Sequence, residues 1–202
     1  MENLNLADIT RKIFESKFML LTRKSLGELT AIKSERVLSN LILKLVSSNI
    51  LTKLEKNKYV RKDNSIKSFN IANLIYSPSY ISFDTALNYH GVLAQFPYEI
   101  SSATTRKSTN KNIEGFLYTY THFKTELFFG YYKQDNMLIA EPEKALLDQI
   151  YLALKGFKRL NLDEYDYAKI NKVKLKEYFT KYPKTKQTQK MAEMVQGIWQ
   201  TC

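Results

Sequence analysis

The sequence predicts an α+β protein with two domains, residues 1–68 and residues 69–202. In the first domain, apolar residues recur at helical spacing in three short segments, and two β-prone runs follow them. Beyond residue 67, aromatic and β-branched residues alternate with small polar ones, which favours a small, mainly antiparallel sheet mixed with helices. From about residue 157 onward, the chain is expected to form a helical tail.

The first domain is expected to begin with three helices. Residues 6–16 form an amphipathic stretch, and Thr22 offers a hydroxyl that can cap a short helix over residues 23–29. After a polar break at residues 30–33, Ser34 can cap a longer third helix. The apolar stripe predicted for this third helix consists of Val37, Leu38, Leu41, Leu45 and Val46.

Two β-prone runs follow, at residues 50–54 and 59–61, and the polar segment 55–58 joins them. They predict a hairpin with a basic tip. A short helix, a tight polar turn, a longer helix with one polar and basic face, and a hairpin form the layout of a winged helix-turn-helix, in which the second helix of the motif enters the major groove of DNA. We therefore expect residues 1–68 to be a winged helix-turn-helix DNA-binding domain.

The polar face of the third helix and the tip of the hairpin, or wing, carry the residue types that DNA recognition requires. Arg and Asn can make bidentate contacts with guanine and adenine edges, while Lys and Ser hold phosphates. Because Arg36 and Asn40 are one helical turn apart, both can reach the same groove. The candidate DNA-binding residues are Lys33, Ser34, Arg36, Asn40 and Lys44 on the helix, and Lys56, Lys58 and Arg61 on the wing. Two alternatives stay open, a merely solvated face and a protein-docking scaffold.

The distribution of charge supports a polyanion-binding module attached to a different kind of domain. The chain carries a formal net charge of +11, with 31 Lys and Arg against 20 Asp and Glu. Residues 1–70 hold 14 basic and 7 acidic residues, residues 71–150 hold 6 and 8, and residues 151–202 hold 11 and 5. Two basic ends thus flank a nearly neutral middle. A generically basic, solubilising surface remains the alternative.

The second domain is expected to alternate strands with a few helices. Ser82 can cap a helix that ends near Gly91, and Pro142 can begin a helix that Gly156 ends. The predicted strands cover residues 98–105, 115–123, 127–132 and 137–140, with a polar loop at 106–112. Two further helices, about 171–181 and 185–197, would form the tail. Its lysines are compatible with RNA, with an acidic partner, or with a solvated helical bundle.

Three runs of the second domain resemble a known protein family. They are YISFDTALNYHGVL at residues 80–93, EISSATTRK at 99–107 and IAEPEKALLDQIYLAL at 139–154. In their order and spacing, after an N-terminal winged helix-turn-helix, these runs resemble AbiEi-type antitoxins. The resemblance covers most of the chain and weakens after Gly156. None of the matching motifs is catalytic.

The resemblance implies a bacterial toxin-antitoxin system of type IV, often linked to abortive phage infection. Such an antitoxin represses its own operon by binding inverted repeats in double-stranded promoter DNA. Its C-terminal domain counters a nucleotidyltransferase toxin encoded alongside, with direct contact left open. Pro142, Glu143, Lys144 and Asp148 match the helix pattern of the family, but the resemblance assigns no activity to them. Helix initiation and core packing explain Pro142 and residues 145–147 equally well.

No cofactor, metal site or enzyme activity is expected. The two histidines, His90 and His122, are far apart in the sequence, six glycines leave no phosphate-binding loop, and no Ser-His-Asp or Cys-His pattern is evident. A nuclease or another nucleic-acid-modifying enzyme targeted by the winged helix is the alternative. It would need clustered carboxylates, and Asp84, Glu99, Glu126 and Asp135 are scattered in the sequence.

A cytoplasmic protein without a membrane anchor is expected. The single cysteine, Cys202, permits neither an intramolecular disulfide nor a cysteine-based zinc site, which fits a reducing compartment. The first residues do not resemble a signal peptide, and no apolar run approaches the roughly 20 residues that span a bilayer.

Overall fold

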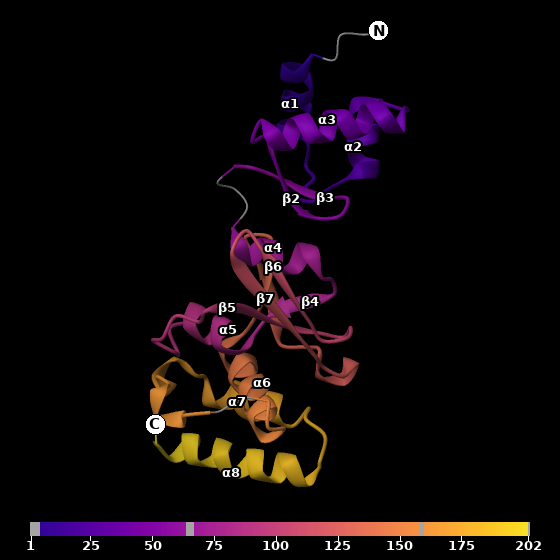
Figure 1. The fold of residues 1–202 in the computed structure, drawn as a ribbon. Helices are drawn as coiled ribbons and strands as arrows, with labels where there is room; N and C mark the ends of the chain where they lie inside the picture. The colour runs from indigo at the N-terminus through magenta and orange to yellow at the C-terminus, as the bar shows by residue number, and fades with distance from the viewer. Residues whose placement is uncertain (1–4, 64–66, 158–159, 202) are drawn as a thin grey trace. The chain divides into compact units, whose positions relative to one another are not determined.

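The computed structural model describes residues 5–63, 67–157 and 160–201 and confirms an α+β architecture (Figure 1). The chain forms two compact units, Met1–Lys67 and Ser68–Cys202, here called unit 1 and unit 2. The boundary predicted between residues 68 and 69 lies one residue away. Cys202 and residues 64–66 lie outside the described residues.

Unit 1 combines three helices with a three-stranded antiparallel sheet. Its elements are α1 (Leu6–Glu15), β1 (Leu21–Thr22), α2 (Arg23–Thr30), α3 (Glu35–Ser47), β2 (Leu51–Glu55) and β3 (Lys58–Arg61). The strand order is β1-β3-β2, with Leu21 opposite Tyr59. The sequence did not predict β1, because two residues carry no alternation and pair only with a strand nearly 40 positions later.

The helices of unit 1 begin where local capping chemistry predicts. Thr22 and Ser25 cap α2 reciprocally, each side chain bonding the backbone N–H of the other, which confirms Thr22 as the cap. Ser34 occupies the capping position of α3, but its side chain makes no capping hydrogen bond. Ala31, between α2 and α3, adopts a left-handed conformation with φ of 57°, which turns the chain sharply between the two helices.

The buried face of α3 differs from the predicted apolar stripe at one position. Leu38, Leu41 and Leu45 of α3 are buried as expected. Ile42 is also buried, whereas Val37, which was predicted to be buried, is 40% exposed. The cause is geometric, since positions 38, 41, 42 and 45 share one side of a helix of 3.6 residues per turn. The buried cluster consists of Ile9, Ile13, Leu21, Leu26, Leu38, Leu41, Ile42, Leu45, Leu51 and Tyr59.

The predicted hairpin forms from β2 and β3. Glu55 lies opposite Lys58, so the tip consists of Lys56 and Asn57, and Asn57 takes the left-handed conformation that such a tight turn requires. The backbone N–H of Arg23 donates to the Asn57 carbonyl at 3.3 Å. The tip of the hairpin therefore lies beside the start of α2.

Unit 2 is built on a six-stranded mixed sheet of order β6-β7-β5-β4-β9-β8. The strands are β4 (Ser79–Ile81), β5 (Glu99–Thr104), β6 (Thr109–Ile113), β7 (Phe116–His122), β8 (Tyr131–Gln134) and β9 (Met137–Ala140). The pairs β4/β9 and β5/β7 are parallel, and the other three are antiparallel. The sheet is thus larger than predicted, and it is mainly antiparallel, as expected.

Three strands of this sheet differ from the sequence prediction. β4 was not predicted, and β6 forms within the segment predicted as a polar loop, because a turn at Glu114 and Gly115, both with positive φ, folds it back onto β7. β8 begins later than the predicted strand at residue 127, where the short 3-10 turn Thr125–Leu127 lies instead.

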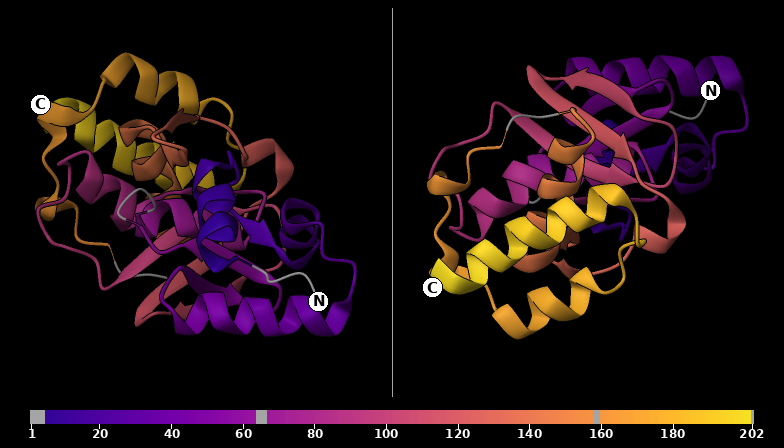
Figure 2. Two further views of the ribbon diagram at one scale, coloured as in Figure 1. Left: turned by 90° about the horizontal axis from the view of Figure 1, so that it is seen from above. Right: turned by 90° about the horizontal axis from the view of Figure 1, so that it is seen from below.

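The helices of unit 2 pack around α6, except for α4, which packs against the sheet. They are α4 (Ser68–Ile75), α5 (Phe83–Tyr89), α6 (Pro142–Leu154), α7 (Lys172–Phe179) and α8 (Lys186–Thr201), with 3-10 turns at Leu162–Glu164 and Tyr167–Lys169. α6 contacts α5, α7 and α8 and is buried along most of its length. These helices can be followed by their colours in Figure 2. α4 was not predicted. The helix predicted from Pro142 is confirmed, and so are two helices in the tail.

Candidate nucleic-acid interface

The outward face of α3 carries three of the predicted DNA-binding residues. Arg36, Asn40 and Lys44 are exposed, and their side chains form no hydrogen bond or ion pair with the residues that the structure describes. They follow one another at a spacing of four residues, one helical turn, so they lie along the same side of the helix. Their donors are therefore available to a ligand that approaches α3 from solvent.

A cleft of about 840 Å³ lies between α2, the start of α3 and the tip of the hairpin. Five cations line it together with two carboxylates; these residues are Arg23, Lys24, Lys33, Lys56, Lys58, Glu28 and Glu35. The structure thus brings the predicted helix residue Lys33 together with the two wing lysines. Ser34, next to Lys33, is also exposed. An excess of cations around one concave surface favours an anionic ligand.

The two wing lysines differ in their surroundings. Lys56 is exposed at the tip of the hairpin. Lys58 is 33% exposed, and its Nζ atom lies 3.0 Å from a carboxylate oxygen of Glu55 across the turn. Because that ion pair already neutralises Lys58 locally, Lys56 is the better candidate for a phosphate contact.

Arg61, the third predicted wing residue, does not lie on this surface. Its side chain is 15% exposed, and the guanidinium donates to the Phe14 carbonyl at 2.8 Å and faces Asp63 at 3.4 Å. A second, longer hydrogen bond reaches the Ser16 carbonyl. The guanidinium therefore holds the end of α1 against β3, which gives Arg61 a structural role.

Replacing Arg61 by alanine is expected to destabilise unit 1 by about 1–3 kcal/mol, because the carbonyls of Phe14 and Ser16 lose a charged donor. Urea unfolding followed by circular dichroism measures this loss. Lys56→Ala, at the exposed tip of the same hairpin, is the matched control and should leave the unfolding midpoint unchanged. Equal stability of the two variants would contradict the structural role.

Arg23, for which the sequence predicted no role, fixes the angle between α2 and α3. Its guanidinium donates to the Glu35 carboxylate at 2.8 Å, to the Glu35 carbonyl at 2.8 Å and to the Ser39 hydroxyl at 2.7 Å. Since these partners lie in the first turns of α3, Arg23 helps to position the face that carries Arg36 and Asn40. No spacing pattern in the sequence signals such a link.

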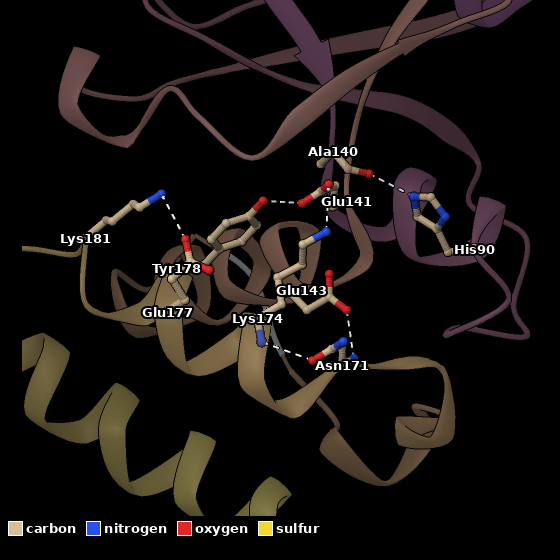
Figure 3. Close-up of polar contacts among 9 residues, drawn as sticks. All are labelled: His90, Ala140, Glu141, Glu143, Asn171, Lys174, Glu177, Tyr178 and Lys181. Carbon is tan, nitrogen blue, oxygen red and sulfur yellow. Dashed lines mark hydrogen bonds and ion pairs between the residues drawn. The ribbon is translucent and has the colours of Figure 1, made fainter.

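In unit 2, the run at residues 139–154 connects the sheet to the tail. Glu141 accepts hydrogen bonds from the Tyr178 hydroxyl and, at 2.9 Å, from Lys174 Nζ, both on α7 (Figure 3). Glu143 is buried, and its carboxylate accepts from the backbone N–H of Asn171 at 2.7 Å. The two carboxylates therefore anchor α7 to the start of α6.

Burial raises the pKa of the Glu141 carboxyl, but the Tyr178 hydrogen bond and the Lys174 ammonium outweigh burial and hold the pKa below its usual 4.5. A depressed folded-state pKa stabilises the fold above pH 4.5, and this contribution is lost as the pH falls through the folded value. We expect the stability difference between wild type and Glu141→Gln to shrink on acidification. Urea midpoints between about pH 3 and 7 measure it, and a difference that stays constant would contradict the ion pair.

Lys144 and Asp148 form a fully buried ion pair one turn apart on α6. Asp148 also accepts hydrogen bonds from Tyr80 at 3.0 Å, Ser82 at 2.8 Å and Tyr182 at 2.8 Å. Ser82 therefore does not cap α5 with its side chain, contrary to the prediction, since its hydroxyl is used here. Burial lowers the pKa of Lys144, and Asp148 opposes that shift. The pair joins β4, α6 and the segment between α7 and α8.

The four carboxylates considered for a nuclease do not come together as a group. Asp84 and Glu99 line one small cavity of about 270 Å³, while Glu126 lies in the 3-10 turn and Asp135 in the turn between β8 and β9. Asp84 also accepts a hydrogen bond from Gln149 at 2.6 Å. Among the described residues, no three His, Cys, Asp or Glu side chains gather as a metal ion would require.

The histidines lie apart and each contacts a backbone carbonyl. His90 Nε2 is 2.8 Å from the Ala140 carbonyl, and His122 Nδ1 is 2.9 Å from that of Arg106. His90 occupies the capping position at the C-terminal end of α5. None of the helices in the described ranges combines the length and the apolarity needed to cross a membrane.

Comparison with known proteins relates the chain to others by fold. No protein-family model matches the sequence, and no curated protein matches it. Among solved structures, the Rv2827c protein from Mycobacterium tuberculosis is similar, with a TM-score of 0.55 and 12% sequence identity over 96% of this chain and 75% of that chain. At this identity the similarity concerns the fold alone. The whole two-unit α+β chain is thus similar in fold to the Rv2827c protein.

Proposed function

We propose that unit 1 is a winged helix-turn-helix module that binds double-stranded DNA. The observation that carries the proposal is the free polar face of α3, where Arg36, Asn40 and Lys44 have no partner in the described part of the chain. The element order α1-β1-α2-α3-β2-β3 and the strand order β1-β3-β2 agree with that module, since they place a helix-turn-helix before a hairpin.

In this proposal α3 lies in the major groove. Arg36 and Asn40 contact guanine and adenine edges, and Lys44 holds a phosphate. Lys33, Ser34 and Lys56 hold the phosphate backbone beside the groove, because they lie on the rim formed by the turn before α3 and the hairpin tip. Lys58 contributes less, as its ion pair with Glu55 would have to open.

We further propose that the chain is an AbiEi-type antitoxin, a cytoplasmic repressor of its own operon that counters a nucleotidyltransferase toxin through unit 2. The support is the resemblance of the runs at residues 80–93, 99–107 and 139–154. Their residues form β4, α5, β5, β9 and α6, which are the central elements of unit 2. DNA binding by unit 1 would supply the repression of a promoter with inverted repeats.

A mobility-shift experiment tests the repressor role. The purified chain should shift a duplex that contains its own promoter, at moderate salt, more strongly than a shuffled duplex of the same length. Affinity should fall with rising salt, because phosphate contacts release counterions. Equal binding to both duplexes would reject the repressor role. Co-expression with the product of the adjacent reading frame tests the antitoxin role, and failure to restore growth would reject it.

A further inference from the structure

Two apolar side chains interrupt the polar face of α3. Leu43 is 68% exposed and Val37 is 40% exposed, whereas the core side of the same helix holds Leu38, Leu41 and Leu45. Leu43 follows Asn40 by three residues and precedes Ser47 by four, which places it on the outward ridge. Val37 precedes Asn40 by three residues, so the two apolar side chains flank Asn40 along the helix.

Single exposed apolar residues are common on protein surfaces and need no explanation by themselves. Here the surroundings narrow the choice of partner. The same face carries Arg36, Asn40 and Lys44 without partners among the described residues, and unit 1 is strongly basic. A complementary surface must therefore offer anions, hydrogen-bonding groups and isolated apolar groups together. The major groove of duplex DNA does so, since thymine presents a C5 methyl group beside the hydrogen-bonding base edges.

We infer that Val37 and Leu43 read thymine C5 methyl groups on either side of the base pair contacted by Asn40. The inference rests on the proposed DNA binding and adds to it a sequence preference, namely A·T pairs flanking that position. It also assigns a role in base recognition to two apolar residues, whereas the other proposed DNA contacts are charged or polar. Methyl contacts contribute discrimination between bases, whereas Lys44 and Lys56 act on any sequence.

The first part of the test removes single methyl groups from the DNA. A duplex enriched from a random library by the wild-type chain is synthesised with thymine throughout. It is then synthesised again as a series in which deoxyuridine replaces one thymine of the half-site at a time. Deoxyuridine pairs identically and lacks only the methyl group. Fluorescence anisotropy should show about a fourfold loss of affinity for each methyl group removed at the two contacted positions.

Protein variants identify which side chain contacts each methyl group. Leu43→Ala should abolish the thymine preference at one position and Val37→Ala at the other. Val173→Ala, at an apolar side chain of α7 that is 80% exposed, is the matched control and should retain both preferences. Equal binding of thymine and deoxyuridine duplexes by the wild type would overturn the inference while leaving DNA binding intact.

Two other outcomes overturn the inference in a different way. If no duplex is enriched from the library, the proposed DNA binding fails and the inference fails with it. If Leu43→Ala changes the mass of the protein in solution, as measured by light scattering, while thymine and deoxyuridine duplexes bind alike, the apolar residues belong to an interface between copies of the chain.

Discussion

Replacing Asp148 by alanine is expected to destabilise unit 2 by about 3–5 kcal/mol, because the ammonium of Lys144 would stay buried without its counter-ion. Aromatic rings surround that ammonium, with ring centres of Phe129 at 4.7 Å and Tyr182 at 5.2 Å. Lys144 is itself fully buried, so its ammonium group is shielded from solvent. Urea unfolding measures the loss, and hydrogen exchange of the α6 and β4 amides assigns it to unit 2.

Lys144→Met should cost less than Asp148→Ala. The methionine side chain can fill the aromatic surroundings, and the carboxylate left behind keeps three hydroxyl donors from Tyr80, Ser82 and Tyr182. The matched control is Glu28→Ala, which removes the acid of the exposed pair Lys24–Glu28 at the same four-residue spacing. That change should cost less than about 0.5 kcal/mol. Similar losses for Asp148→Ala and Glu28→Ala would contradict the structural importance of the buried pair.

The elements that could be predicted from the sequence are those specified by residues close in the chain. Reciprocal capping at Thr22 and Ser25, proline at the start of α6 and a left-handed Gly156 after it are all local signals. The helices α1, α2, α3, α5 and α6 were located from such signals together with apolar periodicity. Their ends agree with the structure to within a few residues.

Strands that carry no signal of their own in the sequence could not be predicted. β6 reads TNKNI, which has no apolar alternation, and it forms because β7 supplies hydrogen-bonding partners across a tight turn. β4 and β9 pair in parallel although more than 50 residues separate them. Composition alone does not specify such a pairing, since strand propensity depends on the neighbouring strand.

The candidate interface was predictable to the extent that exposure follows helical periodicity. Arg36, Asn40 and Lys44 are exposed because they lie opposite Leu38 and Leu45 on α3. Arg61 could not be placed in this way, because its partners Phe14 and Ser16 lie more than 40 positions earlier. The four-residue spacing of Lys144 and Asp148 does not reveal that the pair is buried, because ion pairs at this spacing also form on exposed helix faces.

Replacing both Arg36 and Asn40 by alanine is expected to weaken operator binding by about 30-fold to 20,000-fold. Each bidentate base contact contributes roughly 1–3 kcal/mol of discrimination, and each factor of ten corresponds to about 1.4 kcal/mol. The fold should be unaffected, because neither side chain has a partner among the described residues. Fluorescence anisotropy on the promoter duplex measures the loss, and circular dichroism checks the fold.

Comparing the loss of affinity for the promoter with the loss for a shuffled duplex distinguishes base contacts from phosphate contacts. Arg36→Ala with Asn40→Ala should reduce the preference for the promoter over a shuffled duplex. Lys56→Ala should instead weaken binding to both duplexes equally and reduce the salt dependence, as the loss of one phosphate contact does. Arg11→Ala on α1, where the guanidinium pairs with Asp8 at 2.7 Å, is the matched control for removal of an exposed arginine. Full promoter affinity in the double variant would mean that α3 does not lie in the groove, and another surface of the chain would have to be sought.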